Sequence, residues 1–497
     1  MKNTFTKLLS LVLALMLCLG MFAACTGGGQ TTSPKDTDEP DDLLGITEDT
    51  IWVGNTAPTT GAMAKYATFN YGLQAAFEAY NKAGGYKGMS IKLKHYDDGS
   101  EAANTSTLID KLIHEDEVFA IVGHVGSYAV DATLETLIDE EIPMVYAAAG
   151  NNELFNENAD TLGEKGIFPV QPLNEPEGRM LILRAFAPAE KGGFAAKKVG
   201  VIYNSNEASR ALYSGIQKEL ATLPESYRNS VVPQEVTTSD YSAAANALKA
   251  AGCDLVIVTV IADDFFTCLS TMANIDYKCT VLTSYNNSSV ADFNDANTKL
   301  QSQYYDIFTT MNVFAQAWLD ISSTDYYFKR PDSALYQAYR ALAQVYEKDE
   351  NGNRVEVGKG GFTEEYWNVA EDIYDYVLTV EPTKAFAMSY NAYALAGYIA
   401  GDIFCQAMEE LEASGKALSR ANLISILESK EYKIAMADVL SFANGMRTGV
   451  QNFALTWMFD AHNIPNEAGE FVNDHVATSV TVHGLMSIED YRALLQE

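Results

Sequence analysis

The stretch between residues 118 and 150, VFAIVGHVGSYAVDATLETLIDEEIPMVYAAAG, constrains the fold of this chain more than any other stretch. Its apolar run 118–122 ends at Gly123 and is typical of a buried parallel strand. An amphipathic helix follows, and then a second strand over residues 143–146. Two parallel strands joined by a helix place the loops that follow them at the carboxyl edge of one sheet, where open α/β sheets bind ligands. The sequence therefore predicts a ligand-binding edge.

The two loops at this edge carry residues suited to a small ligand. Gly126 and Ser127 offer backbone N–H groups and a hydroxyl at a helix N-terminus, which is a favourable place for an anion such as a carboxylate. His124 is expected in the same loop. Residues 147–150 have no bulky side chain, so a ligand could lie directly against their backbone.

Length and charge narrow the class of protein. A chain of 497 residues is expected to form two or three compact units. The formal net charge of -32 argues against nucleic-acid binding, because phosphate contacts need clustered Lys and Arg side chains. We therefore expect the acidity to keep an exposed protein soluble, and attraction of cationic ligands is the alternative.

The N-terminus has the pattern of an export signal over residues 1–24. Lys2 and Lys7 precede an apolar run, 8–19, that is too short to span a bilayer comfortably. Residues 21–25 resemble a bacterial lipobox, in which a diacylglycerol is attached to the cysteine, here Cys25; Phe22 stands where such boxes usually have Leu. Residues 25–48 have the composition of a flexible tether. We expect an exported protein, lipid-anchored to the outer face of the bacterial cytoplasmic membrane, with ordinary cleavage after residue 24 as the alternative.

Strand and helix patterns alternate over two regions of the chain. Before residue 170 the predicted strands are 51–55, 89–96, 118–123 and 143–146, and the helices between them begin near 68, 101 and 127. From residue 197 the predicted strands are 198–203, 229–236, 254–261 and 279–283, with helices over 207–220, 241–251 and 264–275. This order predicts an α/β fold of two Rossmann-like lobes, each with a doubly wound parallel sheet.

The motifs within this order carry a resemblance to a known family. They are Pro58-Thr59-Thr60-Gly61 with Tyr66, Asn81-Lys82-Ala83-Gly84-Gly85, Tyr96-Asp97-Asp98, Ile121-Val122-Gly123-His124 with Ser127, Ala147-Ala148-Ala149 and Tyr390-Asn391-Ala392. The chain resembles the type I solute-binding proteins, specifically the branched-chain amino-acid binding family of ABC importers.

The resemblance implies the type I periplasmic binding protein fold, in which the chain crosses three times between two hinged lobes. It implies a first lobe over residues 49–172 plus 311–455 and a second over 173–310 plus 456–497. Residues 321–384 form a segment longer than in its relatives, rich in tyrosine and with a hairpin-turn pattern at 351–353. We expect a mostly helical addition to the first lobe there, and a partner-docking surface is the alternative.

The resemblance also implies a ligand site. Ser127, Ala148 and Ala149 match positions that hold an amino-acid carboxylate, while Gly150 replaces a hydroxyl residue. Tyr66 matches an aromatic residue that closes over the ligand. In the second lobe, the family's aromatic contacts fall at Ala208 and Ile261, and its acid that pairs with the ligand ammonium falls at Tyr285. Because a buried ammonium needs a carboxylate, either Asp263 or Asp264 supplies the charge or the ligand is not an α-amino acid.

No catalytic pattern competes with this interpretation. The six histidines have no metal-ligand spacing, and Ser127 lacks the G-x-S-x-G elbow of a nucleophile. We therefore expect a protein that is not an enzyme and that has no metal or cofactor. The resemblance implies that it captures a small amino-acid-like or carboxylate- or amide-bearing solute for ABC permease subunits. A ligand-sensing receptor of the same fold, feeding a signalling partner, is the alternative.

The sequence leaves open whether two of the cysteines form a disulfide. Cys253 and Cys279 each precede a predicted strand of the second lobe. If those strands are neighbours, the two residues lie side by side at the amino edge of the sheet, where either a disulfide or two free core thiols would fit.

Overall fold

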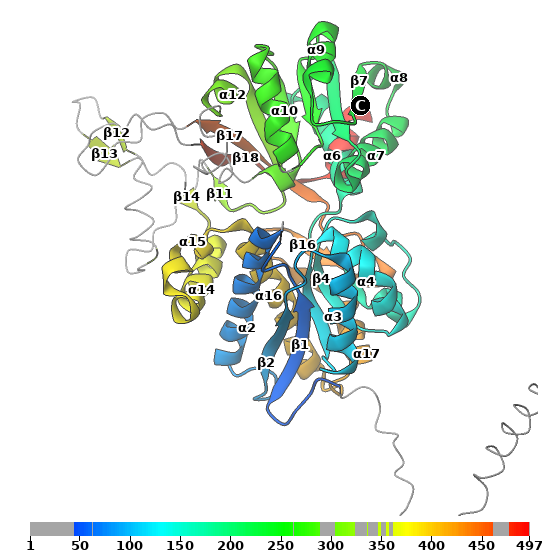
Figure 1. Ribbon diagram of the computed structural model, residues 1–497, viewed down its shortest axis with the longest axis vertical. Coiled ribbons are helices and arrows are strands. Elements are labelled where there is room, and N and C mark those ends of the chain that lie inside the picture. Colours follow the sequence, from blue (N-terminus) through cyan, green and yellow to red (C-terminus); the bar gives the residue numbers. More distant parts are fainter. Residues whose placement is uncertain are drawn as a thin grey trace, which may run out of the picture. The chain divides into compact units, whose positions relative to one another are not determined.

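The computed structural model describes residues 44–61, 63–261, 263–288, 304–323, 335, 346–348, 354–356, 361–460 and 477–496. These residues form two lobes, each built on a mostly parallel sheet with helices on both faces (Figure 1). Within these ranges, no helix combines the length and the apolar character needed to cross a bilayer. The predicted signal segment, the tether and Cys25 lie outside the described residues.

The first lobe contains a five-stranded parallel sheet. Its strand order is β2-β1-β3-β4-β5, with β1 (Thr50–Thr56), β2 (Ser90–Tyr96), β3 (Ala120–Val125), β4 (Met144–Ala148) and β5 (Ile167–Phe168). The connecting helices are α2 (Phe69–Lys82), α3 (Ala102–His114), α4 (Ser127–Asp139) and the short α5 (Leu162–Lys165). The order doubles back at β1, as predicted for a doubly wound sheet.

Alternating side chains of this sheet enter two separate cores. Ile51, Val53 and Val122 belong to the core shared with α2 and with α16 (Ala392–Ser414). Ile121 and Met144 face the other way, into the core that holds the apolar side chains of α3 and α4. Both faces of the strands are therefore buried, which explains the nearly continuous apolar runs of the sequence.

The second lobe contains a seven-stranded sheet of order β18-β17-β10-β9-β8-β6-β7. Its strands are β6 (Val199–Asn204), β7 (Val231–Val236), β8 (Leu255–Val258), β9 (Thr280–Thr283), β10 (Asn312–Ala317), β17 (Asn452–Asp460) and β18 (Ala477–Ser487). The first five are parallel, and β17 and β18 are antiparallel to their neighbours. The helices of this lobe are α6 (Asn174–Phe186), α7 (Glu207–Thr222), α8 (Glu225–Arg228), α9 (Ser242–Ala251), α10 (Asp263–Asn274), α12 (Tyr304–Thr310) and α18 (Ile488–Gln496).

The strand pairing corrects two of the predicted lobe boundaries. Strand β10 pairs with β9 and β17, so residues 312–317 belong to the second lobe, and so does the start of β17 at Asn452. The chain passes between the lobes from β5 to α6, from β10 to α14 (Glu364–Val380), and from the short helix η7 (Ala443–Gly445) to β17. The predicted boundary at residue 311 assigns β10 to the first lobe, and the one at residue 455 divides β17, because neither strand pairing is visible in the local sequence pattern.

In the described part of each lobe, a pair of long helices crosses with the two backbones in close contact. A Cβ atom on Gly72 of α2 would lie 1.7 Å from the carbonyl oxygen of Ala394, and one on Gly397 of α16 would lie 1.9 Å from that of Phe69. In the second lobe, Gly178 of α6 and Gly215 of α7 face each other's helix in the same way. Only glycine permits this approach. Gly72 and Gly397 therefore set the positions of α2 and α16 relative to each other, and Gly178 and Gly215 do the same for α6 and α7.

The long segment after β10 is described only in part. Helix α14 packs on α2, with α15 (Ala385–Ser389) beside it (Figure 1). The Tyr398 hydroxyl donates to Asp372 over 2.5 Å, which ties α14 to α16. Short antiparallel pairs join β11 (Ser322–Ser323) to β14 (Gly361–Phe362) and β12 (Tyr346–Lys348) to β13 (Arg354–Glu356). The predicted turn at 351–353 lies outside the described residues, between β12 and β13.

The remaining elements of the first lobe follow α16. They are α17 (Arg420–Leu427) and a small antiparallel pair of β15 (Glu431–Lys433) and β16 (Val439–Ser441).

The described cysteines are free thiols buried in the two lobes. The register that pairs Leu255 with Thr280 places Cys253 and Cys279 at the amino edge of β8 and β9. Burial raises the pKa of the Cys279 thiol to about 12 and also raises the pKa of the Cys253 thiol.

Candidate functional site

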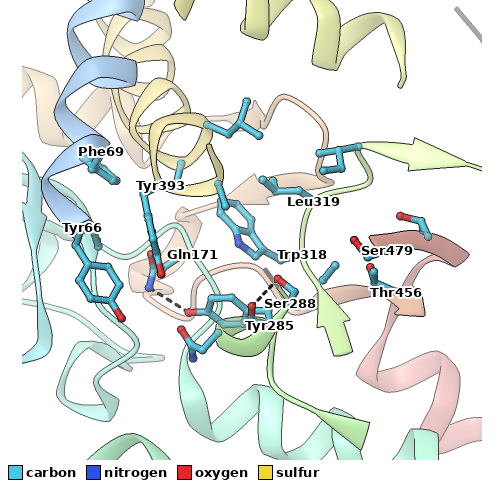
Figure 2. Close-up of a pocket in the computed structure, with 18 of the residues that line it drawn as sticks. Tyr66, Phe69, Gln171, Tyr285, Ser288, Trp318, Leu319, Tyr393, Thr456 and Ser479 are labelled. Atoms are coloured by element: carbon cyan, nitrogen blue, oxygen red, sulfur yellow. Dashed lines mark hydrogen bonds between the residues drawn. The ribbon is translucent and has the colours of Figure 1, made fainter. Parts of the chain in front are cut away.

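A cavity of about 200 Å³ is lined by side chains from both lobes (Figure 2). The first lobe contributes Tyr66, Phe69, Val125, Ala148 and the start of α16, and the segment that follows β10 contributes Trp318, Leu319 and Ile321. From the second lobe come residues that follow β9, the end of β10 and residues of β17 and β18: Tyr285, Asn286, Ser288, Ala317, Thr456, Ser479 and Thr481. Gln171, in the first connection between the lobes, completes the polar part of the wall.

Aromatic rings form one side of the cavity. Tyr66 and Tyr393 meet edge to face, with ring centroids 4.6 Å apart. The buried ring of Tyr146 lies 5.5 Å from that of Phe69 and 6.4 Å from that of Trp318, so it supports both of these lining rings from behind. Aromatic pairs at these separations are favourable beyond the area that they bury.

Helix α16 begins directly at the cavity because of its cap. The side chain of Asn391 accepts hydrogen bonds from the backbone N–H groups of Tyr393 and Ala394, each over 3.0 Å. It also accepts one from the Thr68 hydroxyl, over 3.1 Å. Asn391 therefore satisfies the free N–H groups of the helix and joins its start to the segment that carries Tyr66.

Tyr285 is held from both sides. The amide of Gln171 donates to its hydroxyl over 3.1 Å (Figure 2). That hydroxyl donates to the carbonyl oxygen of Pro172 over 3.2 Å. The Ser288 hydroxyl donates to the Tyr285 carbonyl oxygen over 2.7 Å. Burial, and then the nearby Glu177 carboxylate, raise the pKa of the Tyr285 phenol well above its ordinary value, so Tyr285 stays protonated.

A buried acid fixes the backbone beneath Tyr285. Glu177 of α6 accepts from the Tyr285 backbone N–H over 2.7 Å and from the Ser284 hydroxyl over 2.8 Å. Its side chain is fully buried, and burial raises the pKa of Glu177 to about 8. Glu177 is not among the described residues that line the cavity.

Three of the residues proposed from the sequence lie at this cavity, namely Tyr66, Ala148 and Tyr285. Gly126 and Ser127 lie where β3 passes into α4, and Ala149 and Gly150 follow β4, at the same edge of the sheet. These four are not among the described lining residues. A Cβ atom on Gly150 would lie 2.7 Å from Oδ1 of Asn174, so this loop is already packed against the start of α6.

His124 lies in strand β3, not in the loop where the sequence placed it. Its side chain is fully buried between Thr56 and Thr133, with Nδ1 3.3 Å from the first hydroxyl and Nε2 3.0 Å from the second. Burial lowers the pKa of His124 to about 4, so the imidazole is neutral. Both ring nitrogens are thus occupied by hydroxyl groups within the lobe.

The two aspartates considered as charge partners lie at the start of α10, away from the described wall of the cavity. Asp263 is exposed, and Asp264 accepts a hydrogen bond of 2.9 Å from the Asn204 amide. Ala208 and Ile261, where the resemblance placed aromatic contacts, are also absent from the described lining.

Sequence reasoning missed most of the cavity wall. Trp318, Thr456, Ser479 and Thr481 come from segments that only the pairing of β10, β17 and β18 brings together. The motif at residues 390–392 did mark the start of α16, and the tyrosine that follows it, Tyr393, lines the cavity. That motif was the one signal in the sequence from which Tyr393 could have been found.

The chemistry of this cavity is that of binding. Its described lining residues have amide, hydroxyl, aromatic and aliphatic side chains. Among the described residues, no group of three or more His, Cys, Asp or Glu side chains could hold a metal ion.

Comparison with known sequences identifies relatives of this chain. The model of a family described as periplasmic binding protein matches residues 50–351. An amino acid binding protein of Pseudomonas aeruginosa is 25% identical over 209 residues, which cover 41% of this chain and 52% of that protein. A leucine-, isoleucine-, valine-, threonine- and alanine-binding protein of the same organism is 29% identical over 131 residues, 26% of this chain and 34% of that protein. The matched region thus spans about half of the first relative and about a third of the second.

Solved structures share the fold over nearly the whole chain. A possible leucine/isoleucine/valine-binding protein from Rhodopirellula baltica aligns with a TM-score of 0.57 at 15% identity, covering 89% of this chain and 98% of that one. A fatty acid ABC transporter substrate-binding protein from Thermomonospora curvata aligns with a TM-score of 0.57 at 14% identity, covering 90% and 95%. These likenesses show the two-lobed fold.

Proposed function

Because the chain belongs to the periplasmic binding protein family, we propose that it is the extracytoplasmic substrate-binding protein of an ABC importer. It captures a small solute between its two lobes and presents the closed form to membrane permease subunits. The observation that carries this proposal is the cavity, whose wall is formed by side chains of both lobes.

A ligand in such a cavity couples binding to lobe closure. A solute that contacts Tyr66 of the first lobe and Tyr285 of the second gains both sets of contacts only when the lobes are together. It therefore stabilises the closed form by its differential affinity. The proposed ligand contacts at the cavity are Tyr66, Ala148 and Tyr285, with Trp318 and Tyr393 added by the structure.

Relatives support a small organic solute as the ligand class. Their names refer to amino acids in one case and to a fatty acid in another. We propose a small carboxylate- or amide-bearing solute. The remaining candidates from the sequence, Gly126, Ser127, Ala149 and Gly150, are proposed to act only if the ligand extends along the edge of the first sheet.

The test of this function is ligand-dependent stabilisation of the mature protein. Amino acids, amides, aromatic acids and fatty acids are screened for a rise in melting temperature, because binding to the native state alone stabilises it. The double variant Tyr66→Ala/Tyr285→Ala is expected to bind the stabilising compound with a Kd at least tenfold higher, and its melting temperature should therefore respond less. The matched control is Tyr213→Ala, since Tyr213 stacks on Tyr203 outside the described cavity wall. A response that survives the double variant would show that the solute binds elsewhere.

We further propose that Cys25 is acylated and holds the protein at the outer face of the cytoplasmic membrane. The supporting observation is the lipobox-like sequence at residues 21–25. In its native cell, the protein is expected to fractionate with membranes and to incorporate radioactive palmitate. Cys25→Ala is expected to abolish the label and to release the protein, whereas Cys405→Ala, at a buried site in α16, leaves both unchanged. Soluble behaviour of the unmutated protein would contradict the anchor.

A further inference from the structure

We propose that the cavity between the lobes selects an uncharged solute with a planar ring and rejects free α-amino acids. This inference rests on the proposed function and narrows its ligand class from carboxylate- or amide-bearing solutes to uncharged ones. It begins from the wall of the cavity, in which no described lining residue has a charged side chain.

A free α-amino acid would bring an ammonium and a carboxylate into this wall. Burying an ammonium without a carboxylate partner costs on the order of several kcal/mol. Three acids considered for that role are engaged elsewhere or exposed, and the half-buried Asp320, between the lining residues Leu319 and Ile321, is not itself among the described lining residues. The Glu177 side chain accepts from Ser284 and Tyr285, Asp264 accepts from Asn204, and Asp263 is exposed.

An anionic ligand also lacks a partner in the described wall, which contains no Arg, Lys or His. Lys65, the lysine beside Tyr66 in sequence, is exposed, with its ammonium 5.5 Å from the Tyr66 ring centroid. The N-terminus of α4, where Gly126 and Ser127 could hold a carboxylate, contributes no residue to the described wall. A ligand without net charge avoids both penalties.

The arrangement of the wall favours a ring beside Tyr66 and Tyr393, with polar partners on more than one side of it. Tyr66 and Tyr393 lie on one side of the cavity, and Thr456 and Ser479 lie on the opposite side (Figure 2). Trp318 lies between these two groups (Figure 2). An aromatic or conjugated ring gains roughly 0.5–1.5 kcal/mol for each well-placed ring contact.

Amide and hydroxyl groups of the wall can donate and accept hydrogen bonds without carrying charge. They belong to Gln171, Asn286, Ser288, Thr456 and Ser479. Such groups match a carbonyl, amide or hydroxyl of the solute. At about 200 Å³ the cavity is smaller than a drug-sized pocket, so a solute with a single ring or two fused rings fits it best.

The test compares ligands that share a ring and differ only in charge. Phenylacetamide, phenylacetate, phenethylamine and L-phenylalanine are titrated by calorimetry, together with neutral nucleobases, phenols, L-leucine and a fatty acid. The neutral ring compounds are expected to include the tightest ligand, at least tenfold tighter than every charged compound. Tightest binding of L-phenylalanine, L-leucine or any other charged compound would overturn the inference, as would binding of no neutral ring compound.

A charge introduced by mutation tests whether the ligand binds against this wall of the cavity. Thr456→Asp places a carboxylate in the wall, and Thr456→Asn is its matched neutral control. The aspartate variant is expected to lose at least tenfold in affinity for the neutral ligand and to gain at least tenfold for phenethylamine relative to the asparagine variant. If neither variant folds, Ser479→Asp and Ser479→Asn, at a half-buried position, make the same comparison. Equal ligand preference in the two variants would overturn the inference.

A different result would refute the proposed function itself. That result is a panel in which no compound, charged or neutral, raises the melting temperature of the mature protein. An amino acid that binds tightly, and depends on Tyr66 and Tyr285, leaves the proposed function standing and overturns only the ligand class.

Discussion

Glu177→Gln is expected to make the protein more stable at alkaline pH while leaving its stability at acidic pH nearly unchanged. The Glu177 side chain is fully buried in α6, and burial raises its pKa from 4.5 to about 8. Between these two pH values the folded state holds a proton that the unfolded state has released. Folding stability therefore falls as pH rises through this window, and the loss is complete above about pH 8.

The size of this loss follows from the shift in pKa. Each pH unit corresponds to about 1.4 kcal/mol, so the interval from 4.5 to about 8 corresponds to about 5 kcal/mol as an upper limit. Glutamine keeps the shape of the protonated acid. Its carbonyl oxygen can accept from the Tyr285 N–H, and its amide can donate to the Ser284 hydroxyl, so little stability is lost at pH 5.

The measurement is urea unfolding of wild type and Glu177→Gln at intervals between pH 5 and pH 9. The free energies of unfolding are expected to agree at pH 5 and to separate by several kcal/mol in favour of the variant by pH 8.5. Glu225→Gln, at an exposed position in α8, is the control and should follow the wild-type curve. A variant that is less stable than wild type at every pH would show that Glu177 is ionised and stabilising in the folded state.

Two further predictions concern the packing of helices. Gly397→Ala is expected to destabilise the protein by about 1–3 kcal/mol in urea unfolding and to weaken ligand binding, because its Cβ would lie 1.9 Å from the Phe69 carbonyl oxygen. As a control, the stability difference between Glu409→Ala and Glu409→Gly, at an exposed position of the same helix, measures the effect of helix propensity alone. A Gly397→Ala variant as stable as the wild type would refute the close contact. Arg492→Met is expected to lower the free energy of unfolding by about 3–5 kcal/mol, because it leaves the buried Glu219 carboxylate without the two 2.8 Å hydrogen bonds that join α18 to α7. The double variant Arg492→Met/Glu219→Met should recover most of this stability. If the losses of the two single variants simply add in the double variant, the pairing is contradicted.

The sequence alone determined the alternation of strands and helices in both lobes. Buried parallel strands need continuous apolar runs, and these runs place β1, β3 and β8 with errors of only a few residues at their ends. Helix ends also depend on local backbone chemistry, which needs no distant partner: Gly84 and Gly85 adopt positive φ after α2, and the Asn206 side chain caps α7 by accepting from the Ala208 N–H. The fold class was predictable for this reason and the family from the resemblance of its motifs, and both are confirmed.

Only the tertiary structure decided which residues meet in the cavity. Its wall joins residues as distant in sequence as Tyr66 and Thr481, and their meeting depends on antiparallel pairing of β17 with β10 and β18. Local patterns carry no record of such pairing. Burial was undetermined for the same reason, because whether His124 points into a ligand site or between two threonines depends on residues 68 positions before it and 9 after it. A strand's periodicity fixes which side chains share a face, whereas the neighbours across that face come from segments that are remote in the chain.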